Sequence, residues 1–140
     1  AARIADDIHM TLRKFKREEP VMMSSAEILI APESRSEIAN AMSVGAGVIR
    51  TRASLESTAQ RLEEISRSVS DKPCVEAWEA TNLFTLAQVI VASALIREET
   101  RGSHWREDFP NESDAWLRRI VEQMDGAGKL THRFEEVTND

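Results

Sequence analysis

A long apolar stretch between Pro73 and Gly102 constrains the fold more than any other feature of this sequence. Pro73 is tolerated in a first helical turn, Asp71 can serve as the N-cap, and Gly102 fits just beyond a helix C-terminus. The apolar side chains cover much of the circumference of the predicted helix: Val75, Trp78, Leu83, Leu86, Val89, Ile90, Ala94 and Leu95. A helix that is apolar on most sides is usually buried, so we expect a helix ending near Arg101 at the centre of a bundle.

Three further segments place apolar residues at helical spacing. These are Ile4, Ile8, Leu12 and Phe15 in residues 2–18; Ile38, Met42, Gly45 and Ile49 in residues 34–49; and Leu55, Ala59, Leu62, Ile65 and Val69 in residues 53–69. Ser34 and Glu37 have the spacing of a capping box, in which each side chain satisfies a free backbone N–H. The sequence therefore predicts an all-α fold, a small bundle of three to four helices around one long central helix.

The last part of the chain, residues 102–140, has a different character. It reads as a charged loop over 102–110, a short helix over 113–124 that carries Trp116, and a turn at 125–128. Apolar and polar residues then alternate from Leu130 to Phe134, which is the period of a strand. One strand alone is marginally stable in water, so we expect it to pair with residues 21–30 or with a segment outside this chain.

Length and charge limit the classes of function. The 140 residues fit one domain, and a net charge of −6 makes nucleic acid a poor partner because an acidic surface repels phosphate. The longest apolar run, residues 89–96, contains Ser93 and stops at Arg97, so we expect no membrane span. Cys74 is the only cysteine, which excludes an internal disulfide and a cysteine-rich zinc site and fits a cytoplasmic protein. The chain starts without an initiator methionine or a signal pattern, as expected of a fragment.

Two weak motifs have simpler explanations. Gly45 and Gly47 resemble part of a dinucleotide-binding loop, but that loop needs a preceding strand and a third glycine, and Arg50 stands at the third position. Close approach of two helices explains these glycines better. The histidines are His9, His104 and His132, and no two of them have the spacing of metal ligands on a helix. We expect them at the surface or at an interface, and we expect Cys74 to be a partly buried thiol.

The residues from 97 to 110 hold most of the chemical information. They include three arginines, one histidine and four carboxylates, interrupted by Trp105 and Phe109. A solvated network of salt bridges would explain the charges, with Arg97 and Arg101 close to the negative end of a helix dipole. Large aromatic side chains beside arginines are also typical of buried interfaces. No nucleophile–base pair stands out, so the residues alone predict no reaction.

This stretch resembles the C-terminal signature of the flavoprotein family of succinate dehydrogenase, fumarate reductase and L-aspartate oxidase. That signature reads Glu-Ser-Arg-Gly-Ala-His, then Arg, then Asp, an aromatic residue and Pro. The matching residues here are Glu99, Thr100, Arg101, Gly102, Ser103, His104, Arg106, Asp108, Phe109 and Pro110. Thr100 and Ser103 are mild departures. Residues 79–87, the segment from Met42 to Arg50, and Asp114 with Trp116 are also similar to the family, although Arg119 replaces a frequent histidine.

The similarity covers most of residues 38–134, and residues 1–18 resemble the helix that closes the family's flavin domain. The whole chain then reads as one domain, with a helical bundle over 34–101 and the motif loop, short helix and tail over 102–140. The tail, residues 128–135, resembles that of L-aspartate oxidases, which implies a parent enzyme that oxidises L-aspartate to iminoaspartate with FAD in de novo NAD synthesis. The family's catalytic and substrate-binding residues belong to the flavin-binding and capping domains, so the resemblance assigns no catalytic, cofactor or metal residue to this chain.

The resemblance implies that those two domains of the parent chain are the partners of this one. We expect Glu99, Arg101, His104, Arg106 and Asp108 to form a paired, partly desolvated polar cluster at the domain junction, and the isolated chain to bind no FAD and to be inactive. One alternative is the C-terminal domain of a succinate dehydrogenase or fumarate reductase flavoprotein, which serves a membrane-associated complex with an iron–sulfur partner. Another is a free-standing helical interaction module with Trp105, Phe109 and Trp116 as its anchors. The sequence gives no oligomeric state.

Overall fold

A computed structural model describes residues 28–125 and 128–137 of the chain. The helix expected over residues 2–18 lies outside the described residues. The elements follow one another along the chain as β1 Leu29–Ile30, α2 Ser34–Gly45, β2 Ile49–Arg50, α3 Arg52–Ile65, β3 Val69–Ser70, α4 Val75–Ile96, β4 Trp105–Arg106, a 3₁₀ turn Asp114–Trp116, β5 Arg118–Met124 and β6 Leu130–Glu136.

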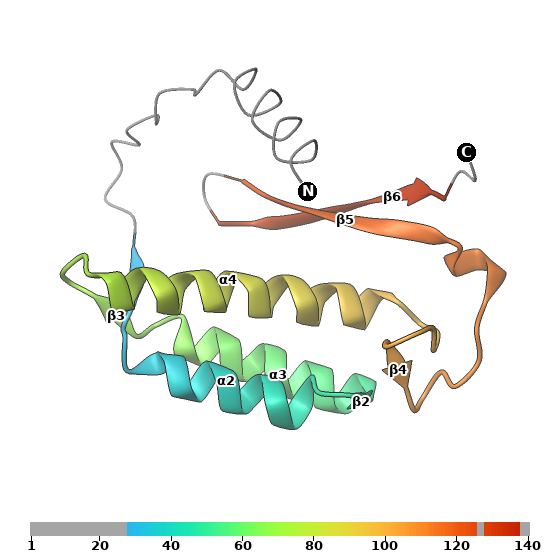
Figure 1. The fold of residues 1–140 in the computed structure, drawn as a ribbon, viewed down its shortest axis with the longest axis horizontal. Coiled ribbons are helices and arrows are strands. Elements are labelled where there is room, and N and C mark those ends of the chain that lie inside the picture. The colour runs from blue at the N-terminus through green and yellow to red at the C-terminus, as the bar shows by residue number, and fades with distance from the viewer. Residues whose placement is uncertain (1–27, 126–127, 138–140) are drawn as a thin grey trace, which may run out of the picture.

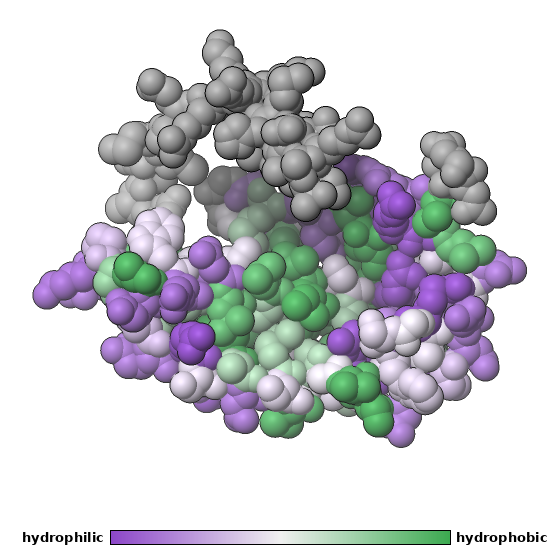
Figure 2. Space-filling view, in the orientation of Figure 1, coloured by the Kyte–Doolittle hydropathy of each residue, from purple (hydrophilic) through white to green (hydrophobic). Residues whose placement is uncertain are grey.

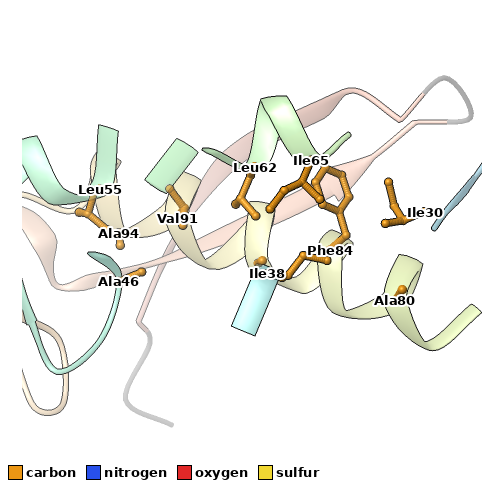
Figure 3. Packing of buried hydrophobic residues seen from close by; sticks show 11 residues of the cluster. Ile30, Ile38, Ala46, Leu55, Leu62, Ile65, Ala80, Phe84, Val91 and Ala94 are labelled. Carbon is orange, nitrogen blue, oxygen red and sulfur yellow. The ribbon is translucent and has the colours of Figure 1, made fainter. Parts of the chain in front are cut away.

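The three helices α2, α3 and α4 pack together and form the core, which confirms the helix-dominated fold (Figure 1). The buried residues of α4 recur every three or four positions and make one face of the helix: Ala77, Ala80, Phe84, Ala87, Val91 and Ala94. Four of these are alanines, so the helix backbones approach closely. The Phe84 ring lies beside Ile65 of α3, and Ile38 of α2 belongs to the same buried cluster (Figure 3).

The opposite face of α4 is apolar and exposed, in contrast to the central burial that the sequence predicts. Val75, Trp78, Leu86 and Ile90 are each at least 44% exposed. Figure 2 shows hydrophobic side chains gathered over the middle of α4. Among the described residues α4 is thus one of three helices, and α2 and α3 pack against one face of it. We call these four residues the apolar stripe.

The expectation that no segment could cross a membrane needs correction. Within the described residues, one helix, α4, is long enough and apolar enough to cross a membrane, judged by length and composition alone. Core helices meet the same two criteria, and α4 buries six residues against its neighbours.

The helix starts are capped by other residues than the sequence predicts. Glu33 stands at the N-cap of α2 without a side-chain bond, and Glu37 instead pairs with Arg61 of α3. The capping box belongs to α3, where Thr51 and Ser54 exchange bonds between side chain and backbone. Cys74 caps α4, because its Sγ accepts a hydrogen bond from the Ala77 N–H at 3.4 Å. The thiol is partly buried, as expected.

Two predicted helices end early, and α4 does so as well. Ile49 and Val69, the last apolar residues of the two predicted helices, lie in the short strands β2 and β3 and are exposed. α4 stops at Ile96 rather than near Arg101, because Arg97 adopts an extended conformation. Gly102, with φ of 56°, turns the loop between Arg101 and His104 and does not end the helix.

Gly45 marks a close contact between α2 and α3, as the sequence predicts. A Cβ at this position would lie 2.9 Å from the Ser54 carbonyl oxygen and would overlap the Thr58 hydroxyl. Larger residues therefore cannot fit there without moving one helix.

The C-terminal extension is a β-hairpin, not a short helix followed by one strand. β5 pairs with β6 in antiparallel register from Arg118↔Glu136 to Met124↔Leu130, so the predicted strand finds its partner within the chain. Residues 29–30 pair instead with β3. The hairpin runs along α4 on the side away from α2 and α3 (Figure 1), and Ser93 of α4 donates to Glu122 of β5 at 3.0 Å.

Candidate functional site

The charged residues of the motif gather where α4 ends, at what we call the polar corner: Arg50, Arg97, Glu99, Arg101, His104, Arg106 and Asp108. β2 and β4 build it by pairing in parallel, with Ile49 opposite Trp105 and Arg50 opposite Arg106. The pairing is continued by the Glu107 N–H, which donates to the Arg50 carbonyl at 2.9 Å. A segment that follows α2 is thereby fixed against the loop that follows α4.

Arg106 is the centre of the polar corner and is fully buried. Its Nη1 donates to the carbonyl oxygens of Ala94 at 2.6 Å and Arg97 at 3.2 Å, which belong to the last turn of α4. The Phe109 ring lies 4.9 Å from the guanidinium carbon. Arg106 therefore places its positive charge on the C-terminus of α4, where the helix dipole favours a cation.

Asp108 supplies the matching negative charge. It accepts two hydrogen bonds of 2.8 Å from Nε and Nη2 of Arg106, and its Oδ2 accepts a third from the backbone N–H of Arg52. The Arg106 bonds lower the pKa of Asp108 far below its ordinary value, against the effect of burial. Since Arg52 begins α3, the carboxylate also stabilises the positive end of that helix dipole.

Glu99 is the second carboxylate of the polar corner and, unlike Asp108, it is fully buried. Burial alone would raise the pKa of Glu99, but hydrogen bonds from Arg101, the Ser113 N–H and Arg97 outweigh it and lower the pKa. Arg97 in turn donates to the carbonyl oxygens of Trp116 at 3.0 Å and Arg118 at 2.6 Å. Glu99 therefore connects the end of α4 to the start of the C-terminal hairpin.

His104 has two hydrogen-bond partners, one that can only donate and one that can only accept, and together they favour the neutral imidazole. Its Nδ1 lies 3.1 Å from Nη1 of Arg50, which can only donate, and its Nε2 lies 3.1 Å from the Arg97 carbonyl oxygen, which can only accept. The proton is thus on Nε2. Burial lowers the pKa of His104, and the positive charges of Arg50, Arg106 and Arg97 lower it further.

Arg50 caps the C-terminal end of α2, the third helix end in the polar corner. Its Nε donates to the carbonyl oxygens of Ala46 at 3.1 Å and Gly47 at 2.8 Å, directly after α2. The polar corner thus joins the C-termini of α2 and α4 to the N-terminus of α3. Each helix end receives a charge of the sign that its dipole favours.

The structure brings together all five residues of the predicted cluster and pairs their charges. Their position at a junction with another domain is untested by the described residues. Sequence reasoning missed Arg50 as a member, although the segment that ends in Arg50 is part of the family resemblance. It also read Arg97 only as a charge near the helix end.

The aromatic residues separate into two groups. Trp105 is 51% exposed, as the hypothesis of a free-standing module requires. Phe109 instead stacks on Arg106, and Trp116 packs edge-on against Phe134 with ring centroids 5.9 Å apart. Arg118 lies over both of these rings, 4.7 Å from Trp116 and 4.0 Å from Phe134. Two of the three expected anchors are therefore used inside the chain.

The arrangement offers little for catalysis within the described residues. They contain no group of three or more histidine, cysteine, aspartate or glutamate side chains that could hold a metal ion. The segment of Gly45 and Gly47 does not form a dinucleotide-binding loop, because Gly45 ends a helix and Thr58 fills the space beside it. The contacts of the polar corner hold the ends of α2, α3 and α4 together.

Comparison with known proteins agrees with this picture. The family profile described as the C-terminal part of the fumarate reductase flavoprotein matches residues 35–140. The chain belongs to this family of flavoprotein oxidoreductases, whose parent chains carry FAD, and it represents their C-terminal domain.

Two curated relatives are similar in sequence. The L-aspartate oxidase of Streptomyces coelicolor is 42% identical over an alignment of 106 residues, and the match covers 69% of this chain and 18% of that protein. The succinate dehydrogenase flavoprotein subunit of Rickettsia felis is 33% identical over an alignment of 134 residues, and the match covers 87% of this chain and 22% of that protein. The chain therefore spans about a fifth of the length of these relatives.

A solved structure shows the same fold. The Mycobacterium smegmatis Sdh1 complex in the apo form superposes with a TM-score of 0.63 at 22% identity, over 96% of this chain and 24% of the matched chain.

Proposed function

We propose that this chain is the C-terminal helical domain of an FAD-dependent L-aspartate oxidase. The parent enzyme oxidises L-aspartate to iminoaspartate, the first step of de novo NAD synthesis in the cytoplasm. The 42% identity to an L-aspartate oxidase over 106 residues supports this most strongly. The described residues hold no catalytic constellation, so the flavin-binding and capping parts of the parent perform the chemistry and this domain supports them from outside.

The same domain is compatible with a succinate dehydrogenase or fumarate reductase flavoprotein. The match to the succinate dehydrogenase subunit extends over 87% of the chain, against 69% for the aspartate oxidase, although its identity is lower. The fold and the polar corner do not separate the two enzymes.

The substrate of the full-length parent decides between them. The purified flavoprotein is mixed without oxygen with L-aspartate or with succinate, and the loss of oxidised-flavin absorbance is followed. We expect L-aspartate to reduce the flavin and succinate to leave it oxidised. Reduction by succinate alone would assign the parent to the alternative. The 140-residue chain by itself should show no flavin absorbance and no aspartate oxidation.

A further inference from the structure

A recess of about 340 Å³ opens at the edge of the polar corner. Charged and polar walls come from Arg50, Arg97, His104 and Ser93, and apolar walls come from Val89, Ile90, Ala94 and Ile120. Ile90 also belongs to the apolar stripe of α4. The exposed apolar face of that helix therefore runs directly into a positively charged recess.

Arg50 differs from the other arginines of the polar corner. Arg97 and Arg101 pair with Glu99, and Arg106 pairs with Asp108. Among residues 28–125 and 128–137, no carboxylate lies within ion-pair distance of Arg50, which contacts only two carbonyl oxygens and His104. Its guanidinium is partly buried, and this burial lowers the pKa of Arg50. A partly desolvated cation without a carboxylate is unfavourable unless something else pairs with it.

The hydrogen bonds of Arg50 show which chemistry is missing. Nε is occupied by the carbonyls after α2, and one N–H of Nη1 is directed at His104. The second N–H of Nη1 and both N–H groups of Nη2 have no partner among the described residues. These adjacent donors form the fork that binds a carboxylate with two parallel hydrogen bonds. The neutral His104 holds the fork in place without competing for the anion.

We propose that this recess receives the carboxylate of an aspartate or glutamate side chain from the flavin-binding part of the parent chain. The occupant is a protein surface because the recess continues into the apolar stripe, an apolar face that no other part of residues 28–125 and 128–137 covers. Most of the parent is available to cover it, since the chain spans only 18% of its aspartate oxidase relative. This inference rests on one part of the proposed function, namely that the chain is one domain of a flavoprotein. It does not depend on the substrate of the parent.

Zero-length cross-linking of the full-length holoenzyme tests the proposal. Arg50→Lys places a primary amine in the recess, and a water-soluble carbodiimide joins that amine to a carboxylate in direct contact with it. We expect mass spectrometry to find an amide between position 50 and one acidic residue of the flavin-binding part. Arg35→Lys, on the exposed surface of α2, is the matched control and should give no link to that residue. A link from position 50 that forms only within residues 28–137 would overturn the proposal.

The unmodified parent provides a second measurement in case Arg50→Lys fails to fold. An arginine-selective dicarbonyl reagent should modify Arg50 more slowly than Arg35 by roughly tenfold or more, because a paired and covered guanidinium reacts only when the interface opens. Equal rates would show that nothing covers the recess and would also overturn the proposal. Reduction of the flavin by succinate instead of L-aspartate would refute the proposed function and leave this inference standing.

Discussion

At the scale of single residues, Arg106 is a buried charge whose hydrogen-bond partners all come from the chain itself. Methionine at this position keeps most of the side-chain volume but leaves Asp108 and the carbonyls of Ala94 and Arg97 without their donor. We expect Arg106→Met to destabilise the fold by about 3 kcal/mol, the lower end of the cost of breaking a buried ion pair, because Asp108 is 28% exposed and stays accessible to water. Urea unfolding followed by circular dichroism measures this loss.

The matched control is Arg67→Met, since Arg67 pairs with Glu63 at the surface and both side chains are 75% exposed. That pair should contribute about 0–1 kcal/mol. An equal loss of stability in the two variants would contradict the view that Arg106 holds the helix ends together.

His104 should make stability depend on pH. The unfolded side chain titrates near 6.5, and the folded pKa is lower. The unfolded state therefore binds more protons below pH 6.5, so the stabilisation by neutral His104 is present above that pH and is lost as the pH falls. We expect His104→Gln to flatten the stability curve below about pH 6.5. A variant curve parallel to that of the unchanged chain would show that His104 is not held neutral.

The residue scale also shows what the sequence can and cannot predict. Glu99, Arg101, His104, Arg106 and Asp108 lie together at the end of α4, as their closeness in the sequence indicates, whereas their place at a domain junction stays a prediction. The motif spacing did not predict the partners, because Arg50 reaches His104 over 54 positions and Arg52 reaches Asp108 over 56. Such contacts depend on the parallel pairing of β2 with β4, which no local pattern indicates.

At the scale of elements, the contact of α2 with α3 depends on Gly45. We expect Gly45→Ala to cost about 1–3 kcal/mol, the usual cost of overpacking, because the added methyl group meets Thr58 and the Ser54 carbonyl. Thermal unfolding measures the effect. Ser43→Ala, on the exposed side of the same helix, should change stability by less than about 0.5 kcal/mol. An unchanged midpoint for Gly45→Ala would mean that the two helices are not in close contact.

We expect the C-terminal hairpin to depend on the cluster in which Trp116 packs edge-on against Phe134 and Arg118 lies over both rings. We expect Trp116→Ala to increase hydrogen exchange in β5 and β6 while the amides of α3 and α4 stay protected, because the hairpin touches the bundle at few places. Leu117→Ala, which removes a half-exposed neighbour, should leave exchange in the hairpin unchanged. Faster exchange throughout the bundle would show that hairpin and helices unfold as one unit.

The elements that were predicted wrongly have one physical cause in common. Residues 113–124 carry apolar side chains at a spacing that suits a helix, yet β5 forms because each of its residues pairs with one in β6. α4 ends early because Arg106, ten residues beyond Ile96, takes the carbonyls of its last turn. The helical core was predictable because its spacing is local, whereas these features come from contacts across the chain.

At the scale of the whole molecule, the described residues place their buried charges on helix ends and leave an apolar stripe exposed. This arrangement is what our proposal, a domain that packs on the rest of a larger flavoprotein, leads us to expect. The account therefore predicts that changes in the polar corner affect how well the parent keeps its flavin, and leave the chemistry of each bound flavin unchanged.

The most direct test is the turnover of the full-length parent carrying Arg101→Ala, expressed per mole of bound flavin. Arg101 contacts the buried Glu99, so its loss should lower the melting temperature or the flavin content of the purified enzyme. The account predicts that kcat per bound flavin stays within about twofold of the unchanged enzyme, well below the tenfold that corresponds to 1.4 kcal/mol. A large fall in kcat per bound flavin, with melting and flavin content unchanged, would contradict it.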